Sequence, residues 1–403
     1  MLKAYKYRIY PSDAQKHHFV QAMGCVRYIY NKGLEIKIKC YEQTGETLSY
    51  FCLANGFLLE EKKTNEWLMV PNAQSLQMAL RNLDNAFTRF FRKQSKFPTF
   101  KKKNGRGSIQ YPQKVSVDFK RSKVKLPKVG EVFCVFDRKF DGKIKTCTVS
   151  KTPTGKFFIS ILVDNDQTLP SKVPIILDGA IGIDLGLTHF AILSDGTKVP
   201  NPRFLSKLLD RLNVLQRRAS RKVKGSNNRR KANLKVARLY ETISNQRSDF
   251  LHKLSTKLIR ENQTIILEDL NVAGMLRNHC LAQNISDVSW GEFVRLLTYK
   301  AEWYGKNLIK IGRFDPSSKL CSCCGWKNPN LTLDVRSWTC QECHTQHDRD
   351  VNAAINIKKF GLIRSNTGQE LPEALAEISS STPKQKAKGK TDRRRKKSSA
   401  KYR

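Results

Sequence analysis

The sequence predicts a multi-domain α/β protein. Its 403 residues are enough for two to four domains of ordinary size. After about residue 175, apolar runs of strand type alternate with helical stretches, which is typical of an α/β domain. The pattern also changes near residues 95 and 170, so we place domain boundaries there.

The N-terminal part predicts one strand, a helical region and a small β-domain. Residues 2–9 alternate in strand fashion, and a Pro-Ser-Asp sequence then opens a helical region that extends to residue 94. Its clearest helix is Ala73–Phe91, where large apolar side chains recur at helical spacing. Residues 95–170 hold short alternating runs between Lys-rich turns, which predicts a β-domain.

The C-terminal half predicts strands and helices in alternation. Two strands around a tight turn are expected within residues 179–197, followed by very basic helices over 204–262 with a break at 225–228. The remaining predicted elements are a buried-type strand at 264–267, an amphipathic helix at 289–304, a strand at 308–313 and a helix at 348–360.

The net charge of +39, from 74 Lys and Arg against 35 Asp and Glu, predicts a polyanionic partner, with nucleic acid as the first candidate. A hydrophobic content of 39% excludes a wholly disordered basic chain. Residues 384–403 hold eleven Lys and Arg and one Asp, a net charge of +10, which leaves +29 for the rest. We expect the low-complexity tail to be disordered and to add only non-specific affinity.

Several classes of protein do not fit the sequence. The N-terminal residues contain no apolar signal core, and no run of about 18 apolar residues occurs. We therefore expect a protein that is neither secreted nor membrane-spanning. No GxxxxGK[ST] loop is present, which argues against hydrolysis of nucleoside triphosphates.

Two CxxC pairs separated by fifteen residues predict a zinc site. The pairs are Cys321 with Cys324 and Cys340 with Cys343. This spacing is typical of a tetrahedral four-thiolate site, which leaves no open position and is therefore structural. Cys323 is interpreted as a spare thiol, and His344 and His347 are weaker alternative ligands.

Three acidic residues lie in or beside apolar strands or at the start of a helix, where they are candidates for a functional site. Asp184 interrupts an apolar strand, Glu268 ends one, and Asp350 opens the last helix. Each has an ordinary alternative: a turn residue, a solvent-facing strand end, and compensation of the helix dipole, which Asp348 would equally provide. Together they would suit a site for two Mg²⁺ or Mn²⁺ ions that cleaves phosphodiesters.

Basic and polar residues give candidate nucleic-acid contacts. Twelve Lys and Arg but only one acid lie between residues 207 and 238, and cations alternate with aromatic residues from 90 to 103. A solvated face is the alternative for the charges, and ordinary core packing for Phe87 and Phe90. The candidates are Arg217, Arg218, Arg221, Lys222, Arg229, Arg230, Lys231, Lys101, Lys102 and Lys103, with Gln77 and Arg81 on the polar side of the Ala73–Phe91 helix.

Four segments carry a resemblance to a known family. In chain order they are GIDLG at Asp184, LEDLN at Glu268, the paired CxxC sequences and HDRDVNAAINI at Asp350. Together they resemble TnpB, the transposon-encoded protein also called OrfB-type transposase, whose family is related to the type V CRISPR effector nucleases. The match is specific between about residues 180 and 360 and looser toward the N-terminus.

The resemblance implies a fold and a set of metal ligands. The fold is an RNase H-like, RuvC-type nuclease domain with an inserted four-cysteine zinc ribbon, an N-terminal helical recognition lobe and a small β-barrel wedge domain. Asp184, Glu268 and Asp350 would be the Mg²⁺ or Mn²⁺ ligands, with Asp350 preferred to Asp348 because it fits a D-x-N-A-A position. The implied domains are residues 1–10 with 95–170 (wedge), 11–94 (recognition lobe), 175–318 with 347–362 (nuclease) and 319–346 (zinc). The basic tail, which we expect to be disordered over residues 363–403, is a departure that the family pattern does not require.

The resemblance also implies partners and an activity. A guide RNA from the transposon end would direct cleavage of matching double-stranded DNA beside a short adjacent motif, in the prokaryotic cytoplasm and at the nucleoid. The leading hypothesis is therefore an RNA-guided, metal-dependent DNA endonuclease with no membrane partner. The alternatives are a DNA- or RNA-binding regulator of transposition without cleavage, and a transposase that acts directly on transposon ends.

Overall fold

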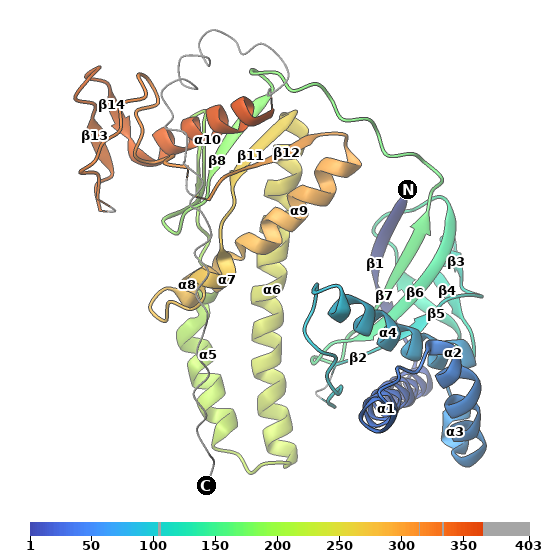
Figure 1. Cartoon of the computed structure of the whole chain (residues 1–403). Helices are drawn as coiled ribbons and strands as arrows, with labels where there is room; N and C mark the ends of the chain where they lie inside the picture. Colours follow the sequence, from blue (N-terminus) through green and yellow to red (C-terminus); the bar gives the residue numbers. More distant parts are fainter. Residues whose placement is uncertain (104–105, 314, 333, 366–403) are drawn as a thin grey trace, which may run out of the picture. The chain divides into compact units, whose positions relative to one another are not determined.

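The computed structural model describes residues 1–103, 106–313, 315–332 and 334–365, which form two compact units (Figure 1). Unit 1 comprises Met1–Leu169 and Leu208–Gln246, and unit 2 comprises Pro170–Lys207 and the described residues between Arg247 and Ser365. Residues 363–365 of the predicted disordered tail instead end the last helix (Arg349–Ser365), and the rest of that tail lies outside the described residues. No described helix has the length and apolar character needed to cross a bilayer.

Unit 1 contains a seven-stranded antiparallel sheet with the order β2-β6-β7-β1-β5-β4-β3. Its strands are β1 (Leu2–Tyr10), β2 (Gly107–Tyr111), β3 (Ser116–Asp118), β4 (Lys123–Leu126), β5 (Gly130–Val135), β6 (Lys143–Lys151) and β7 (Phe157–Asp164). The N-terminal strand thus pairs with strands of the later β-region. The predicted strand at residues 2–9 and the predicted β-domain at 95–170 are both confirmed as β-structure. Backbone pairing runs from edge strand β2 to edge strand β3 without closing, so the barrel implied by the resemblance stays a prediction.

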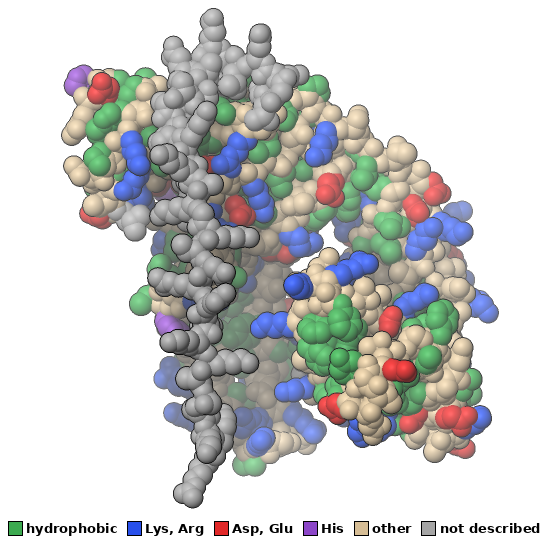
Figure 2. Space-filling model, viewed as in Figure 1, with side chains coloured by type: hydrophobic (Ala, Val, Ile, Leu, Met, Phe, Trp, Pro, Cys, Tyr) green, Lys and Arg blue, Asp and Glu red, His purple; other side chains and the backbone are tan. Residues whose placement is uncertain are grey.

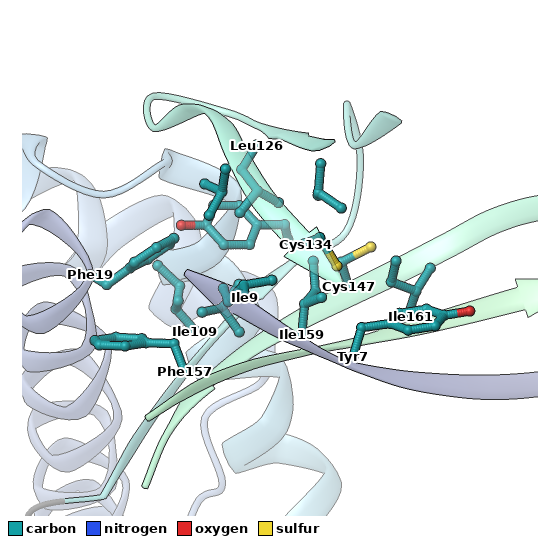
Figure 3. Close-up of a cluster of buried hydrophobic side chains, with 14 of the residues drawn as sticks. Tyr7, Ile9, Phe19, Ile109, Leu126, Cys134, Cys147, Phe157, Ile159 and Ile161 are labelled. Carbon is teal, nitrogen blue, oxygen red and sulfur yellow. The ribbon is translucent and has the colours of Figure 1, made fainter. Parts of the chain in front are cut away.

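Alternation along these strands builds the core of the sheet. Tyr7 and Ile9 of β1 and Ile159 and Ile161 of β7 are almost fully buried, while their neighbours along each strand are more exposed. These side chains pack together, and Phe19 of the first helix covers one end of the cluster (Figure 3). The short alternating runs in the sequence therefore fold because each contributes one apolar face to a shared core.

The predicted helical region is confirmed as two long helices and several short ones. The long helices are α1 (Asp13–Thr44) and α4 (Ala73–Phe91), and the short ones are α2 (Tyr50–Cys52), η1 (Leu53–Phe57), α3 (Leu58–Thr64) and η2 (Glu66–Met69). Ser12 and Gln15 form a capping box at the start of α1. Leu80 of α4 packs tightly against Gly33 of α1, where a Cβ atom would come within 2.8 Å of its side chain.

The basic region forms the predicted pair of helices, α5 (Phe204–Ser220) and α6 (Asn227–Glu261). Gln216 of α5 donates a hydrogen bond to the Tyr240 hydroxyl of α6 at 2.9 Å. Within unit 1, Glu241 of α6 pairs with Lys156 at 2.9 Å and accepts a hydrogen bond from Thr154 at 3.0 Å. These contacts join the helical pair to the β6–β7 turn.

Unit 2 is built on a five-stranded mixed sheet with the order β10-β9-β8-β11-β12. The strands are β8 (Ala180–Asp184), β9 (His189–Leu193), β10 (Lys198–Pro200), β11 (Thr264–Glu268) and β12 (Asn307–Ile311). β8, β11 and β12 are parallel, and β9 and β10 are antiparallel additions. Helices α9 (Trp290–Trp303) and α10 (Arg349–Ser365) complete the predicted alternation of strands and helices.

The two faces of this sheet pack against different helices. Ile183 and Leu267 point into a core that includes Phe293 of α9 and side chains of α6. Ile266 points to the other face and packs with Ile357 of α10. Because side chains alternate along a strand, the parity of a residue decides which of the two cores it joins.

Helix α10 lies unusually close to the central strands (Figure 1). A Cβ atom on Gly182 of β8 would fall 2.1 Å from the carbonyl oxygen of Ala354, and one on Gly361 of α10 would fall 2.3 Å from Ile266. Only glycine fits at these two contacts. They bring the start of α10 toward the ends of β8 and β11.

Several short elements of unit 2 were not predicted. These are α7 (Val272–Met275), α8 (Ala282–Val288) and the two-stranded ribbon of β13 (Ser337–Thr339) and β14 (Gln346–Asp348). The ribbon carries the second CxxC pair in its turn and leads directly into α10. The cysteine segment is thus continuous with the helix that bears Asp350.

Candidate active site and four-cysteine cluster

Asp184 and Glu268 are the last residues of neighbouring parallel strands. Ile183 of β8 pairs with Leu267 of β11, so the two carboxylates follow in matching register on strands about 4.8 Å apart. Both have the same parity as Ile266, which faces α10. The sheet therefore presents two adjacent carboxylates at its carboxyl edge, on the face that α10 covers.

Helix α10 supplies the third carboxylate, and the structure distinguishes its two candidates. Asp348 caps the helix: its Oδ1 accepts hydrogen bonds from the backbone N–H groups of Asp350 and Val351, both at 3.1 Å. Its other oxygen is 2.6 Å from Lys198 Nζ. The Asp348 carboxylate is therefore occupied by capping and an ion pair, whereas Asp350 interacts electrostatically with Asp184.

Mutual repulsion and burial mark Asp184 as the central carboxylate. Its pKa is raised to about 7, first by burial and then by the carboxylates of Glu268 and Asp350, while Arg349 acts in the opposite direction. Two negative neighbours in a sheltered position are unfavourable unless a proton or a cation is bound. The donor set is all oxygen, which suits Mg²⁺ or Mn²⁺.

The contacts of the other two carboxylates differ in character. Glu268 accepts a hydrogen bond from the Ser317 hydroxyl at 2.6 Å, and Asp350 lies 3.5 Å from a guanidinium nitrogen of Arg336. Among the described residues, the cysteines are the one group of three or more potential ligands close enough to enclose an ion. The three carboxylates do not form such a group in the described structure, and their effect on the pKa of Asp184 is what indicates their proximity.

The four predicted cysteine sulfurs converge on one point, all within 4.8 Å of one another. Cys321 Sγ is 3.6 Å from Cys343 Sγ, and Cys324 Sγ is 3.6 Å from Cys340 Sγ. Zinc–sulfur bonds of about 2.3 Å in a tetrahedron place sulfurs roughly 3.8 Å apart, so the set fits zinc. Hydrogen bonding with Thr345 lowers the pKa of Cys343 to about 5, which favours the metal-binding thiolate.

The structure also places the alternative ligands. Cys323 and His344 are exposed, and neither belongs to the four-sulfur group. His347 is buried, and its Nε2 lies 3.0 Å from Cys321 Sγ. His347 therefore contacts a candidate ligand as a hydrogen-bonding neighbour, a role that the sequence did not reveal.

The basic candidates on α5 and α6 are mostly exposed. Arg217, Arg218, Arg221, Lys222, Arg230 and Lys231 reach solvent, and Arg229 is half-buried and donates to the Lys222 carbonyl at 2.9 Å. Within the described part of the chain, no carboxylate forms an ion pair with any of these seven. Figure 2 shows Lys and Arg side chains gathered around the free end of this helical pair. The charges are thus available to a polyanion.

The second group of basic candidates borders a cavity in unit 1. Lys101 and Lys102 line a hollow of about 430 Å³ between α1 and strands β2 and β6, together with Arg27, Arg106 and Lys151. Of the residues that the structure describes, no acidic one lines it. Lys103 is exposed nearby. Such a concentration of cations suits phosphate binding.

The aromatic and polar candidates near α4 lie on the surface or around a second hollow. Phe87, Phe90, Phe91 and Phe97 pack on one another and line a cavity of about 510 Å³. Gln77 and Arg81 are exposed on α4, and the Arg81 guanidinium lies 5.5 Å from the centre of the Tyr50 ring.

Three family models match the chain. They are OrfB_IS605, described as "Probable transposase", over residues 163–279; a "Cas12f1-like, TNB domain" over 290–357; and a "Helix-turn-helix domain" named for OrfB of IS605 over 1–46. Their order agrees with the order of the motifs in the sequence.

Two bacterial relatives match this chain over most of their length. A protein of Streptomyces pristinaespiralis named "Putative RNA-guided DNA endonuclease" is 42% identical over 372 residues, which is 91% of each chain. The chain belongs to the TnpB family. Another relative in this family, InsQ of Escherichia coli K12, carries the same description and is 32% identical over 89% of this chain and 92% of its own.

Two further comparisons add detail without changing this assignment. A chain from a Cas12f1–sgRNA–target DNA complex aligns over 89% of this chain and 98% of its own, with 15% identity and a TM-score of 0.48. The TnpB-family region described as helix-turn-helix forms a strand and a single 32-residue helix in this protein.

The site contains residues that the sequence reasoning missed. Ser317 contacts Glu268, and Asn352 and Asn356 of α10 hold the segment before the cysteines. The two asparagines lie four residues apart in the TnpB-family motif at Asp350, so the sequence could have predicted that they share one face of the helix. Their hydrogen-bond partners could not be predicted, because the segment that they bind has no regular periodicity.

Proposed function

We propose that this protein is an RNA-guided, metal-dependent DNA endonuclease. The observation that carries the proposal is the convergence of Asp184 and Glu268, from adjacent strand ends, with Asp350 at the start of α10. Membership of a family whose relatives are named as RNA-guided DNA endonucleases supports the guide and the DNA target as partners. The cytoplasm of a bacterium, at the nucleoid, is the expected location.

In this proposal, Asp184, Glu268 and Asp350 hold Mg²⁺ or Mn²⁺ at the sheet edge. The ions would supply activation of water and charge stabilisation at the scissile phosphodiester. The protein contributes ligand position: β8 and β11 fix two carboxylates in register, and the close glycine contacts of α10 fix the third. Helix capping and the Lys198 pair keep the neighbouring Asp348 out of the ligand set.

The domain roles follow the same proposal. The unit 2 sheet with α10 would be the RuvC-type, RNase H-like domain, and the four cysteines would hold a structural zinc. Residues 1–10 with 95–170 would form the wedge domain and 11–94 the recognition lobe. The basic residues of α5 and α6 and the cavity at Lys101 would contact nucleic-acid backbone.

The test is guided cleavage by matched variants. Protein purified with its bound RNA is incubated with Mg²⁺ and a plasmid that matches the RNA. Asp184→Ala and Glu268→Gln should each lower the cleavage rate by at least about a hundredfold, because each removes a metal ligand. The control Asp269→Asn changes the adjacent acid, which pairs with Arg313 on the surface, and should cleave normally.

Other outcomes point to the alternatives. RNA-dependent binding without cleavage by the wild type would indicate a regulator of transposition. The description "Probable transposase" supports the other candidate, which predicts RNA-independent strand transfer on transposon ends. Full cleavage by Asp184→Ala would exclude the proposed site.

A further inference from the structure

Ser317 lies between β12 and the four-cysteine cluster and contacts a candidate metal ligand. Its hydroxyl donates to Glu268 Oε1 at 2.6 Å, and the residue is 5% exposed. A short hydrogen bond to a carboxylate, sheltered from water, holds that carboxylate in one orientation. Ser317 thereby leaves the other Glu268 oxygen free to bind an ion.

Helix α10 fixes the backbone of Ser317. The side-chain amide of Asn356 donates to the carbonyl of Ser317 at 2.8 Å and to that of Leu320 at 2.7 Å. Asn356 is 4% exposed, so these bonds replace water inside the structure. The position of Ser317 is therefore set by the same helix that carries Asp350.

The same helix holds the peptide units on both sides of Cys321. Asn352 donates to the Leu320 carbonyl at 2.7 Å and accepts from the Ser322 N–H at 2.8 Å. Lys359, further along α10, donates to the Ser322 carbonyl. Residues 317–322 are thus clamped along their length, with Glu268 at one end and the cysteine cluster at the other.

We propose that residues 317–322 act as a strut that orients Glu268, with Ser317 as the positioning residue and Asn352 anchoring the strut beside Cys321. The inference rests on the proposed function, because it takes Glu268 to be a divalent-metal ligand. It adds that metal affinity at the carboxylate site depends on a segment that belongs to the cysteine cluster. Removal of a hydrogen bond to a metal ligand typically weakens metal binding by about 10–100-fold.

The test measures Mn²⁺ binding to the full chain with its bound RNA, by electron paramagnetic resonance of the free ion. Ser317→Ala should raise the Mn²⁺ dissociation constant at least about tenfold. It should also raise the Mg²⁺ concentration for half-maximal cleavage while leaving the rate at saturating Mg²⁺ within about threefold. The matched control is Ser318→Ala: this neighbouring, half-buried serine makes no hydrogen bond in the described structure, and its Mn²⁺ affinity should not change.

A double-mutant cycle tests the strut. Asn352→Ala should weaken Mn²⁺ binding in the wild type but add little in the Ser317→Ala background, because both act through one path. Additive losses would show that Asn352 acts directly through Asp350 and would overturn the strut. If Ser317→Ala lowers the melting temperature but leaves Mn²⁺ affinity unchanged, Ser317 has only a structural role and the proposal is wrong.

The failure of this inference is distinguishable from failure of the proposed function. If Asp184→Ala leaves Mn²⁺ binding intact, the carboxylate metal site itself is wrong. If Asp184→Ala abolishes binding but Ser317→Ala binds Mn²⁺ as the wild type does, the metal site stands and the positioning role of Ser317 is wrong.

Discussion

Asp184, a metal ligand in the proposed function, carries a cost in stability. Its pKa of about 7 lies well above the usual 3.8 because of burial and two carboxylate neighbours. Between these two values the folded chain retains a proton that the unfolded chain releases, so folding stability falls as the pH rises from about 4 to 7. The charged form of Asp184 therefore destabilises the metal-free fold at neutral pH. Such a cost is expected at a position whose function is to bind a cation.

Asp184→Asn should therefore stabilise the protein in the absence of added Mg²⁺ or Mn²⁺. At pH 8 we expect a gain of about 1–3 kcal/mol, less than the full shift implies because the site is partly exposed to water. The gain should disappear at about pH 3, where the wild-type carboxyl is protonated in both states. Thermal melting at the two pH values checks this, and a variant that melts below the wild type at pH 8 would contradict it.

At the residue scale, the sequence indicated the candidate ligands but not their support. The apolar runs around Asp184 and before Glu268 marked both as candidates, and the resemblance at the Asp350 motif favoured Asp350 over Asp348. Capping by Asp348 agrees with that preference. The Ser317–Glu268 contact could not be predicted, because it joins residues 49 positions apart through an irregular segment.

At the scale of elements, one buried acid of α8 contacts the parts of α5 and α6 that belong to unit 2. Asp287 of α8 accepts hydrogen bonds from the Leu205 N–H in the first turn of α5, at 3.0 and 3.2 Å. It also pairs with Arg247 of α6 at 2.6 Å, and its side chain is only 6% exposed. This carboxylate serves as a helix cap and as the partner of a half-buried cation.

Asp287→Ala should lower stability by about 3–5 kcal/mol, because it leaves Arg247 and a helix N-terminus without their partner. A lower melting temperature, measured without denaturant, is the expected result. Asp249→Ala is the matched control: it breaks an exposed pair with Lys253 on the same helix α6 and should cost no more than about 0.5 kcal/mol. Equal effects of the two substitutions would contradict the capping role.

The exposed cations of α5 and α6 predict a salt-dependent contact with nucleic acid. Replacing Arg217, Arg218 and Arg221 by Gln should reduce the slope of log affinity against log salt by about 2–3, since each arginine would neutralise one phosphate. Filter binding between 50 and 200 mM salt measures the slope. In the control, Lys16, Lys39 and Lys63 are replaced by Gln. These three lysines lie in surface ion pairs, so the control loses the same positive charge but should keep the same slope.

Long, periodic elements were predicted well and short ones were not. α4 has the bounds that its apolar spacing predicts, and β11 and β12 agree within a residue or two. By contrast, α7, α8 and the β13–β14 ribbon were missed, because three to seven residues hold too few side chains to show a period. Their positions are set by tertiary contacts such as Asp287 and by the cysteine cluster.

At the scale of the whole molecule, the chemistry and the countercharge belong to different units. The three carboxylates and the four cysteines lie in unit 2, whereas Lys101, Lys102 and the basic residues of α5 and α6 lie in unit 1. Under the proposed function, unit 1 would contact nucleic-acid backbone and unit 2 would hold the metal ions. Of the net charge of +39, +10 belongs to residues 384–403, which lie outside the described residues, and +29 belongs to the rest of the chain.

Ending the chain at Pro383 should therefore weaken non-specific binding without changing guided cleavage. The truncated chain loses eleven Lys and Arg and one Asp in this segment, so its affinity for unmatched duplex DNA should fall, most strongly at 50 mM salt. Cleavage of matched DNA at saturating protein should remain within about twofold, because affinity no longer limits the rate there. A full-length chain with the eleven basic residues changed to Gln should behave like the truncation, since charge and not length carries the effect. A tenfold loss of matched cleavage in either variant would show instead that the basic segment takes part in the guided reaction.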